Sequence, residues 1–401
     1  MADVTSYAWI LLAASLAFLL AVASSRLSAW LRVPAPALFL IGAAIASNVV
    51  PSLGGISTHA VERIVTVALV VILFDGGMHI GWRRLRSAVG AVAWLGVAGT
   101  VVTAGGVAIA AHLIFQLGWH ESLLIGTALA PTDPAVVFSV LGGREVGGRA
   151  GVLLEGESGA NDPVGIALMV ALLGAHGSGG TAFAAGLLTF ALQMVVGAVI
   201  GIAAGFALRY VLRVRLPNEG LYALRALACA LAVYALATVA HGSGFLAVLI
   251  AGVLVGDEAL PYRAEIRGFS GSLASLAEIV AFVVLGFTVD LTTLGPLNVW
   301  AIGLVLAVLL AFVIRPVLGG LVLWPIRLTR GERLFVLWSG LKGAVPILLG
   351  LFVVTAGAAH AAQIYGIVFI VVAFSVIVQG GLVPTVASRL GVPLTEIPPD
   401  D

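Results

Sequence analysis

The sequence has few charged residues and a single cysteine. Only 10% of its 401 residues are charged and 61% are hydrophobic, whereas a typical soluble domain carries about 25% charged residues. So few polar side chains cannot cover the surface of a soluble body of this size, which excludes a soluble globular protein. The lone Cys229 excludes an intrachain disulfide and argues against a metal site built from several thiolates. The formal net charge of +1 argues against nucleic acid as a partner.

Long apolar runs fill most of the chain, and the mean hydropathy is +1.15. Continuous runs of about twenty apolar residues are typical of transmembrane helices, whereas a transmembrane barrel would show alternating segments of about ten. We therefore expect an all-α polytopic membrane protein in the lipid bilayer. Clusters of Gly, Pro and Arg delimit about thirteen expected spans, at 6–24, 36–50, 61–78, 88–115, 121–141, 150–174, 181–208, 221–240, 243–256, 270–288, 298–323, 333–354 and 363–384.

Arginine placement predicts the orientation of these spans. Sixteen of the 20 basic residues fall in loops that follow odd-numbered spans, and only Arg63 falls in a loop that follows an even-numbered one. Because basic loops stay on the cytoplasmic side, we expect the N-terminus outside and the C-terminus in the cytoplasm. The expected location is the cell (inner or plasma) membrane, with residues 386–401 as a short cytoplasmic tail.

The expected spans contain a hidden repeat. They divide into six, a linker and six, and an offset of seven would invert the second half relative to the first. Mid-span breakers occur in the fifth span, at 130–134 (Ala-Pro-Thr-Asp-Pro), and in the twelfth, at 340–346 (Gly-Leu-Lys-Gly-Ala-Val-Pro). These two spans correspond under the offset. Inverted repeats with broken, crossing helices near the midplane are typical of secondary transporters.

Ionisable residues within the spans cost free energy in the bilayer and are therefore candidates for function. They are Asp75, Asp133, Glu155, Glu157, Asp162, Glu278, Arg315 and Lys342. The densest group is 155–163, where helical spacing places Ser158 and Asp162 on one face and Glu157 and Asn161 on an adjacent one. Such oxygen ligands suit Na⁺ or K⁺. Asp162 lies well inside its span, so we expect it to act in function.

Other charged residues have structural interpretations that compete with functional ones. Asp133, between two prolines, is expected to stabilise the exposed end of a half-helix, with ion ligation as the alternative. Lys342 could stabilise exposed carbonyls or pair with a buried acid. Glu278 and Arg315 are expected to pair with each other. Asp75 could lie at the membrane interface.

Several of these stretches resemble the monovalent cation/proton antiporter superfamily, in particular its NhaP-like sodium(potassium)/proton antiporter branch. They run in the family's order and cover residues 73–344. The matching residues are Leu73-Phe74-Asp75-Gly76-Gly77, Pro131-Thr132-Asp133-Pro134, Glu155-Gly156-Glu157-Ser158 with Asn161-Asp162, Ser243-Gly244-Phe245-Leu246-Ala247-Val248, Glu278 before Phe282-Val283-Val284-Leu285-Gly286, Arg315-Pro316 and Gly340-Leu341-Lys342-Gly343-Ala344.

The resemblance implies a role for each matching residue. Asp162 resembles the carboxylate that binds cation and proton alternately, supported by Asn161, Ser158 and Thr132, so that the monovalent cation would lie at Asp162, Ser158 and Thr132. Asp133 resembles the acid at the helix crossing, and Asp75 is expected to contribute to ion or proton binding. Glu157 resembles the acid that pairs with the basic residue of the twelfth span, here Lys342, while Glu278 and Arg315 resemble a second buried pair.

The resemblance also implies an activity and a domain organisation. The expected activity is exchange of Na⁺ or K⁺ for H⁺, electroneutral, by alternating access at one carboxylate for which cation and proton compete. We expect interface and dimerisation helices at 1–87 and 175–297, an ion-translocating core at 88–174 and 298–385, a homodimer, no cofactor and no enzymatic activity. The family usually has Arg where this chain has Lys342, and often Glu where it has Asp75. Pro163 after Asp162 is more similar to the potassium/proton relatives, so the choice between Na⁺ and K⁺ stays open.

Three other functions fit parts of the sequence. A passive cation channel would need no proton coupling, but no repeated filter loop is present. Gly156-Glu157-Ser158-Gly159 matches the pattern of an intramembrane serine protease with Ser158 as nucleophile and His241 as base, although that chemistry needs neither Glu157 nor Asp162. A transporter for organic anions would favour cationic groups, whereas acids outnumber bases in these spans.

Overall fold

The computed structural model describes residues 34–141, 144–174, 180–295 and 298–396. The expected span 6–24 lies outside the described residues. Within them the chain is helical apart from one short two-stranded ribbon, as the apolar runs predict. The α-helices are α2 (Ala35–Val49), α3 (Thr58–Leu85), α4 (Val89–Trp94), α5 (Thr100–Phe115), α6 (Trp119–Ala128), α7 (Pro134–Val140), α8 (Gly148–Gly174), α9 (Gly180–Val211), α10 (Gly220–Val239), α11 (Gly244–Gly256), α12 (Arg263–Phe287), α13 (Val299–Leu309), α14 (Gly320–Leu323), α15 (Arg330–Trp338), α16 (Ala344–Thr355), α17 (Ala361–Phe374) and α18 (Val383–Leu390).

Shorter elements interrupt or connect these helices. Two are 3₁₀ turns, η1 (Pro51–Gly55) and η3 (Leu291–Leu294). Three are π-helical segments within long helices, η2 (Leu95–Gly99), η4 (Leu310–Gly319) and η5 (Ser375–Gly380). π-Helical segments are rare in proteins, and those that occur are often found at functional sites.

Seven helices among the described residues are long and apolar enough to cross a membrane. They are Thr58–Leu85, Val89–Phe115, Ala184–Val211, Gly220–Val239, Arg263–Phe287, Val299–Leu323 and Ala361–Gly380. Three shorter apolar helices accompany them, at Ala35–Val49, Gly244–Gly256 and Ala344–Thr355. Two of the expected spans, 121–141 and 333–354, each form two short helices, because Gly and Pro interrupt them. The chain is therefore a multi-pass helical membrane protein.

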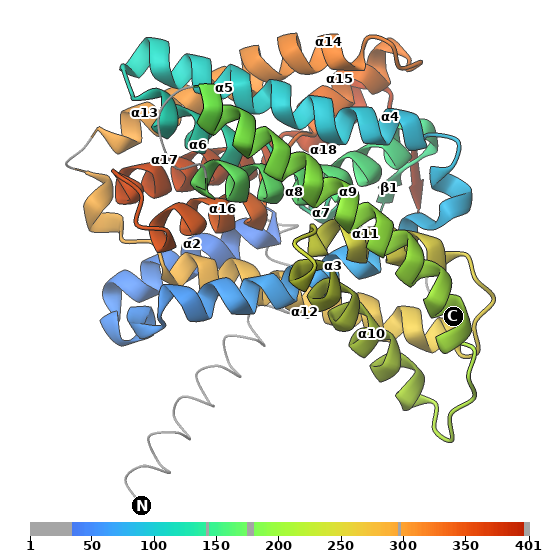
Figure 1. Cartoon of the computed structure of the whole chain (residues 1–401). Helices are drawn as coiled ribbons and strands as arrows, with labels where there is room; N and C mark the ends of the chain where they lie inside the picture. Colours follow the sequence, from blue (N-terminus) through green and yellow to red (C-terminus); the bar gives the residue numbers. More distant parts are fainter. Residues whose placement is uncertain (1–33, 142–143, 175–179, 296–297, 397–401) are drawn as a thin grey trace, which may run out of the picture.

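The helices pack into two groups. In the first helix group, α11 packs on α3 and α9, α12 packs on α2 and α3, and α10 packs on α11. In the second helix group, α5 packs on α6 and η4, α17 packs on α13 and α16, and α8 packs on η2. Figure 1 shows α2, α3 and α12 below and α5 and α14 above. The groups meet where α9, α3 and α11 contact α8 and where α3 and α12 contact α16.

Small residues allow the close helix contacts of the first group. A methyl group added at Gly252 of α11 would come within 2.6 Å of the carbonyl oxygen of Phe74, and one at Gly77 of α3 would come within 2.7 Å of that of Leu249. Both distances are shorter than van der Waals contact allows. Membrane helices, which lack a hydrophobic driving force between them, associate through such small-residue contacts.

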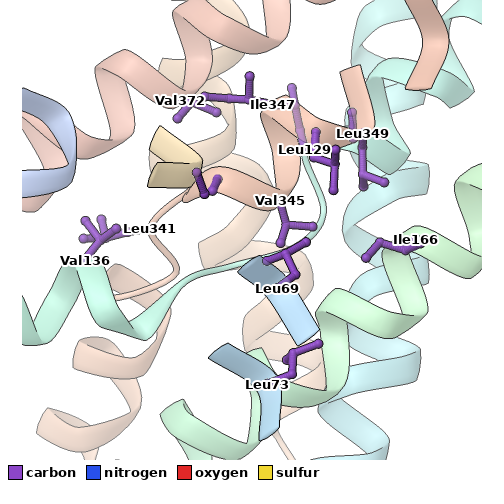
Figure 2. Close-up of a cluster of buried hydrophobic side chains, with 14 of the residues drawn as sticks. Leu69, Leu73, Leu129, Val136, Ile166, Leu341, Val345, Ile347, Leu349 and Val372 are labelled. Atoms are coloured by element: carbon purple, nitrogen blue, oxygen red, sulfur yellow. The ribbon is translucent and has the colours of Figure 1, made fainter. Parts of the chain in front are cut away.

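The two interrupted helices cross in the second group. The first break, residues 129–133, separates α6 from α7, and the second break, residues 339–343, separates α15 from α16. The backbone N–H of Asp133 donates to the carbonyl of Leu341 at 2.8 Å, so the extended segments contact each other directly. Figure 2 shows apolar side chains of α3, α7, α8, α16 and α17 around them, including Leu69, Val136 and Ile166. This packing fixes the crossing in a buried position.

A two-stranded antiparallel ribbon joins distant parts of the chain. β1 (Arg144–Val146), just before α8, pairs with β2 (Leu394–Glu396), after α18. The N–H of Gly147 extends the pairing by donating to the carbonyl of Pro393 at 2.8 Å. The ribbon therefore ties the start of α8 to the last described residues.

Candidate functional site

Helix α8 holds the first break through two polar side chains. Ser158 Oγ donates to the carbonyl of Thr132 at 2.5 Å. Asn161 Nδ2 donates to Thr132 Oγ1 at 2.7 Å, and Asn161 Oδ1 accepts from the Thr132 N–H at 3.3 Å. All three residues are buried. Since Thr132 lies in an extended segment without helical partners, these bonds replace those that an intact helix would have made.

Asp162 lies on α8 beside this contact. Helical spacing puts its side chain on the face of Ser158, one turn away. It is partly exposed, and the described residues provide no hydrogen bond or ion pair to it. One charged residue from each break lies close to this contact, because Asp133 follows Thr132 in the first break and Lys342 of the second break contacts the carbonyl of Pro131. The carboxylate oxygens are therefore open to a proton or an ion at the point where both breaks meet α8.

Asp133 caps the half-helix that follows the first break. Its Oδ1 accepts the N–H of Ala135 at 2.9 Å, which is the N-cap arrangement of α7, and Pro134 occupies the first helical position. Gly343, in the second break, has no side chain, and a methyl group there would collide with the Asp133 carboxylate. The carboxylate is thus used in a structural contact between the two breaks.

The cap predicts different effects for two substitutions of Asp133. Asp133→Ala removes the acceptor and is expected to destabilise the protein by about 0.5–2 kcal/mol, whereas Asp133→Asn retains a capping oxygen. Thermal unfolding in detergent, followed by intrinsic fluorescence, measures the difference. If Asp133→Asn instead eliminates cation transport without loss of stability, the carboxylate charge serves the ion and the capping interpretation is insufficient.

Lys342 neutralises the carbonyl end of the first half-helix. Its side chain is only 1% exposed. Nζ donates to the carbonyls of Ala130 at 3.1 Å and Pro131 at 3.0 Å. These groups lost helical partners at the first break, and a cation there is favoured by the helix dipole. Of the two roles that the sequence left open for Lys342, stabilisation of exposed carbonyls is the one that the structure contains.

The buried ion pair of the site differs from the expected one. Arg315, in η4, donates from Nη2 to Glu157 Oε1 at 2.8 Å, and its Nε donates to the carbonyl of Leu337 at 3.3 Å. Both side chains are 8% exposed. The expected Glu157–Lys342 and Glu278–Arg315 pairs are therefore wrong, and Glu157 pairs with Arg315 instead. Gly340 leaves the space that the guanidinium occupies, which brings Arg315 rather than the Lys342 ammonium to Glu157.

Glu278 and Asp75 lie on helices of the first group. No ion pair of Glu278 is found within the described ranges, where Arg315 pairs with Glu157 instead. Asp75 Oδ2 lies 3.3 Å from His79 Nδ1, one turn further along α3, while its Oδ1 has no hydrogen-bond partner in the part of the chain that the structure describes. The structure thus brings Asp162, Asn161, Ser158, Thr132, Asp133 and Lys342 together, and it places the Asp75 carboxylate beside His79.

Two buried polar residues that the sequence analysis missed also contact the second break. The N–H of Lys342 donates to Ser375 Oγ at 3.1 Å, and Gln379 Nε2 donates to the carbonyl of Trp338 at 2.6 Å. Their sequence signal is a pair of polar residues four positions apart in the otherwise apolar run 364–383. An uncharged pair is less costly in a membrane than a charge, so it does not stand out among the ionisable residues of the spans.

The arrangement supplies oxygen atoms of the kind that bind hard monovalent cations. Asp162 offers a carboxylate, and the hydroxyls of Ser158 and Thr132 keep unused lone pairs after the hydrogen bonds described above. A protonated Asp162 would leave no net negative charge for a cation. Protonation and cation binding at such a carboxylate would therefore exclude each other.

Comparison with known proteins places the chain in a family. Residues 14–389 match the family model described as sodium/hydrogen exchanger, transmembrane. The chain is 35% identical over 379 residues to a K⁺/H⁺ antiporter NhaP of Alkalimonas amylolytica, covering 93% of this chain and 65% of that protein. It is 33% identical over 394 residues to a K⁺/H⁺ antiporter NhaP2 of Shewanella sp. (strain MR-4), covering 97% of this chain and 67% of that protein. The chain thus spans about two thirds of the length of these relatives.

A more distant relative and a solved structure agree with this assignment. The Na⁺/H⁺ antiporter NhaH of Halobacillus dabanensis is 26% identical over 340 residues, which cover 82% of this chain and 83% of that protein. The sodium proton antiporter MjNhaP1 of Methanocaldococcus jannaschii at pH 8 superposes with a TM-score of 0.78 at 22% identity, over 94% of this chain and 96% of that one. This likeness shows the fold. The chain belongs to the sodium/hydrogen exchanger transmembrane family.

Proposed function

We propose that this protein exchanges a monovalent cation, Na⁺ or K⁺, for H⁺ across a cell membrane. The observation that carries the proposal is the Asp162 carboxylate, which has no hydrogen bond or ionic partner among the described residues, beside the crossing of two interrupted helices. Interrupted helices that cross near the midplane are typical ion sites in secondary transporters. The names of the similar antiporters support the same activity.

The proposed mechanism follows from the charge of the site. A bare carboxylate in a region of low dielectric is costly to move, whereas protonated or cation-bound Asp162 carries no net charge. Only the two neutral forms would pass between the outward-open and inward-open states. One proton would then be exchanged for one cation, which makes the exchange electroneutral. The cation would bind at Asp162 with Ser158 and Thr132 as supporting ligands, and Asp75 would assist from α3.

The two helix groups support a division of labour. The second helix group, with residues 88–174 and 298–385, contains both breaks and would form the ion-translocating core. The first would form the interface and dimerisation helices of a homodimer, a domain that we propose to comprise residues 1–87 and 175–297. The exposed apolar face of α9, which includes Leu188 and Val195, suits lipid or a second copy. Alternating access would then be a rigid-body movement of the core against the interface helices.

The topology remains part of the proposal. The interrupted helices lie seven spans apart in the expected count of thirteen, which supports two inverted six-helix repeats. The basic loops support an outside N-terminus and a cytoplasmic C-terminal segment at 386–401.

A cation panel tests the proposed function. Everted membrane vesicles that contain the protein receive an imposed pH gradient, and Li⁺, Na⁺, K⁺ or Rb⁺ is then added. We expect K⁺ to dissipate the gradient fastest, because the K⁺/H⁺ antiporters are 33–35% identical to the chain and the Na⁺/H⁺ antiporter is 26% identical. Saturable dissipation that is independent of membrane potential supports electroneutral exchange. Flux without proton coupling would indicate a channel and contradict the proposal.

A further inference from the structure

The second break is held by a polar pair on η5, as the first break is held by a polar pair on α8. Ser375 Oγ accepts the N–H of Lys342 at 3.1 Å and donates to Gln379 Oε1 at 3.2 Å. Gln379 Nε2 then donates to the carbonyl of Trp338, the last residue of α15. Ser375 is 3% exposed and Gln379 is 5% exposed. The pair therefore spans the break from the end of α15 to Lys342.

These bonds satisfy backbone groups that the interruption of the helix leaves without partners. The carbonyl of Trp338 is one of the orphan acceptors at a helix C-terminus, and the N–H of Lys342 lies in extended chain. Inside a membrane, each such group left unpaired is strongly destabilising, because lipid offers it no hydrogen-bond partner. Ser375 and Gln379 provide partners at both ends of the second break, just as Ser158 and Asn161 do for Thr132 in the first.

The surroundings of Ser375 and Gln379 are typical of a functional site and differ from those of a regular packed helix. Ser375 and Gln379 begin and nearly end the π-helical segment η5, and π-helical segments are frequent at functional sites. Both side chains also line an internal cavity, together with Lys342 and Arg315. The cavity has a volume of ≈ 10 Å³, which is room for about one water molecule. The second break thus has a small polar space beside it.

We propose that Ser375 and Gln379 are positioning residues that hold the second break so that Lys342 reaches the first break beside Asp162. The proposal rests on the proposed cation/proton exchange. Lys342 transmits the effect, because the same residue is anchored through its N–H by Ser375 and contacts the carbonyls of Ala130 and Pro131 through Nζ. The pair touches neither cation nor proton and acts through the placement of the ammonium charge.

The pH profile of exchange tests this role. Lys342 Nζ lies on the carbonyls of the first break, which α8 holds one helical turn from Asp162, and a positive charge at this place favours an ionised carboxylate. Ser375→Ala and Gln379→Met are expected to displace the Lys342 ammonium. The pH of half-maximal exchange should then move upward by about half a unit or more, and the maximal rate should fall. Lys342→Met should move the profile in the same direction, and adding Ser375→Ala to Lys342→Met should move it no further, because both act through one group.

Matched variants separate positioning from a loss of packing. Ser375→Thr keeps the hydroxyl and should retain the wild-type profile. Gln193→Met makes the same substitution as Gln379→Met but on α9, and it should leave both rate and profile unchanged. If Ser375→Ala and Gln379→Met lower only the yield of folded protein, while the folded fraction keeps the wild-type profile, the pair is structural and the proposal is wrong.

A second measurement does not depend on transport. Amide hydrogen exchange of residues 339–343, measured on purified protein in detergent, should accelerate at least several-fold in Ser375→Ala and Gln379→Met and stay unchanged in Gln193→Met. Unchanged exchange in the first two variants would overturn the positioning role. A wild-type protein that moves no cation, with these amide effects present, would instead overturn the proposed function alone.

Discussion

Asp162→Asn is expected to reduce cation-driven proton flux in proteoliposomes to the level of protein-free vesicles. The amide is close in size to the carboxylate, so α8 and its contacts with Thr132 should stay intact. It cannot take up a proton at physiological pH, and it lacks the charge that attracts a cation. Both substrates of the exchange therefore lose their site through one substitution. Flux is measured with a pH-sensitive dye trapped inside the vesicles.

Two variants accompany this experiment. Asp290→Asn changes an exposed carboxylate at the N-cap of η3, where its Oδ1 accepts the N–H of Thr292 at 2.9 Å. Asparagine also serves as an N-cap, so wild-type flux and stability are expected there. Asp162→Glu keeps the charge on a longer side chain and should retain part of the flux. Full flux in Asp162→Asn, with folding verified by thermal unfolding, would remove the proposed ion site.

Arg315→Met is expected to destabilise the protein by about 3–5 kcal/mol, because it leaves the buried Glu157 carboxylate without its partner. The pair joins η4 to α8, with Arg315 Nη2 at 2.8 Å from Glu157 Oε1. The double variant Glu157→Gln with Arg315→Met removes both charges and should recover most of the loss, since a neutral pair no longer carries an unpaired charge. Thermal or denaturant unfolding in one detergent measures each difference.

An exposed pair provides the matched control. Arg213 Nη2 lies 2.8 Å from Glu258 Oε2, with the arginine side chain 52% exposed, and Arg209 also contacts Glu258. Arg213→Met is therefore expected to cost only about 0–1 kcal/mol. Equal losses for Arg213→Met and Arg315→Met would show that the Glu157–Arg315 pair contributes no more than a surface contact.

The sequence contains the local features of the site. Prolines at 131 and 134 and glycines at 340 and 343 predict the interruptions, because neither residue type favours a continuous helix. Helical spacing predicts the shared faces of the polar residues between 155 and 163. Such features depend on neighbours within a few residues, and they follow from the chain itself.

Contacts between distant helices were harder to predict. The sequence shows that Glu157, Lys342, Glu278 and Arg315 are expensive in a membrane and need partners, but it does not show which helix lies opposite. Arg315 pairs with Glu157 because Gly340 leaves space for the guanidinium beside α8. That space depends on the crossing of the two breaks. A regular pattern of apolar residues likewise does not reveal the π-helical segments, of which η4 contains Pro316.

The contact between the two breaks has a consequence for the biosynthesis of the protein. The carbonyl of Pro131 is separated by 211 residues from the lysine that binds it. At a translation speed of about 5–20 residues per second, the ribosome needs roughly 10–40 s to make the intervening chain. During that interval the newly inserted first half holds polar main-chain atoms for which hydrocarbon offers no partner. The insertion machinery, or water that enters the bilayer with the nascent chain, must shelter them until the second half arrives.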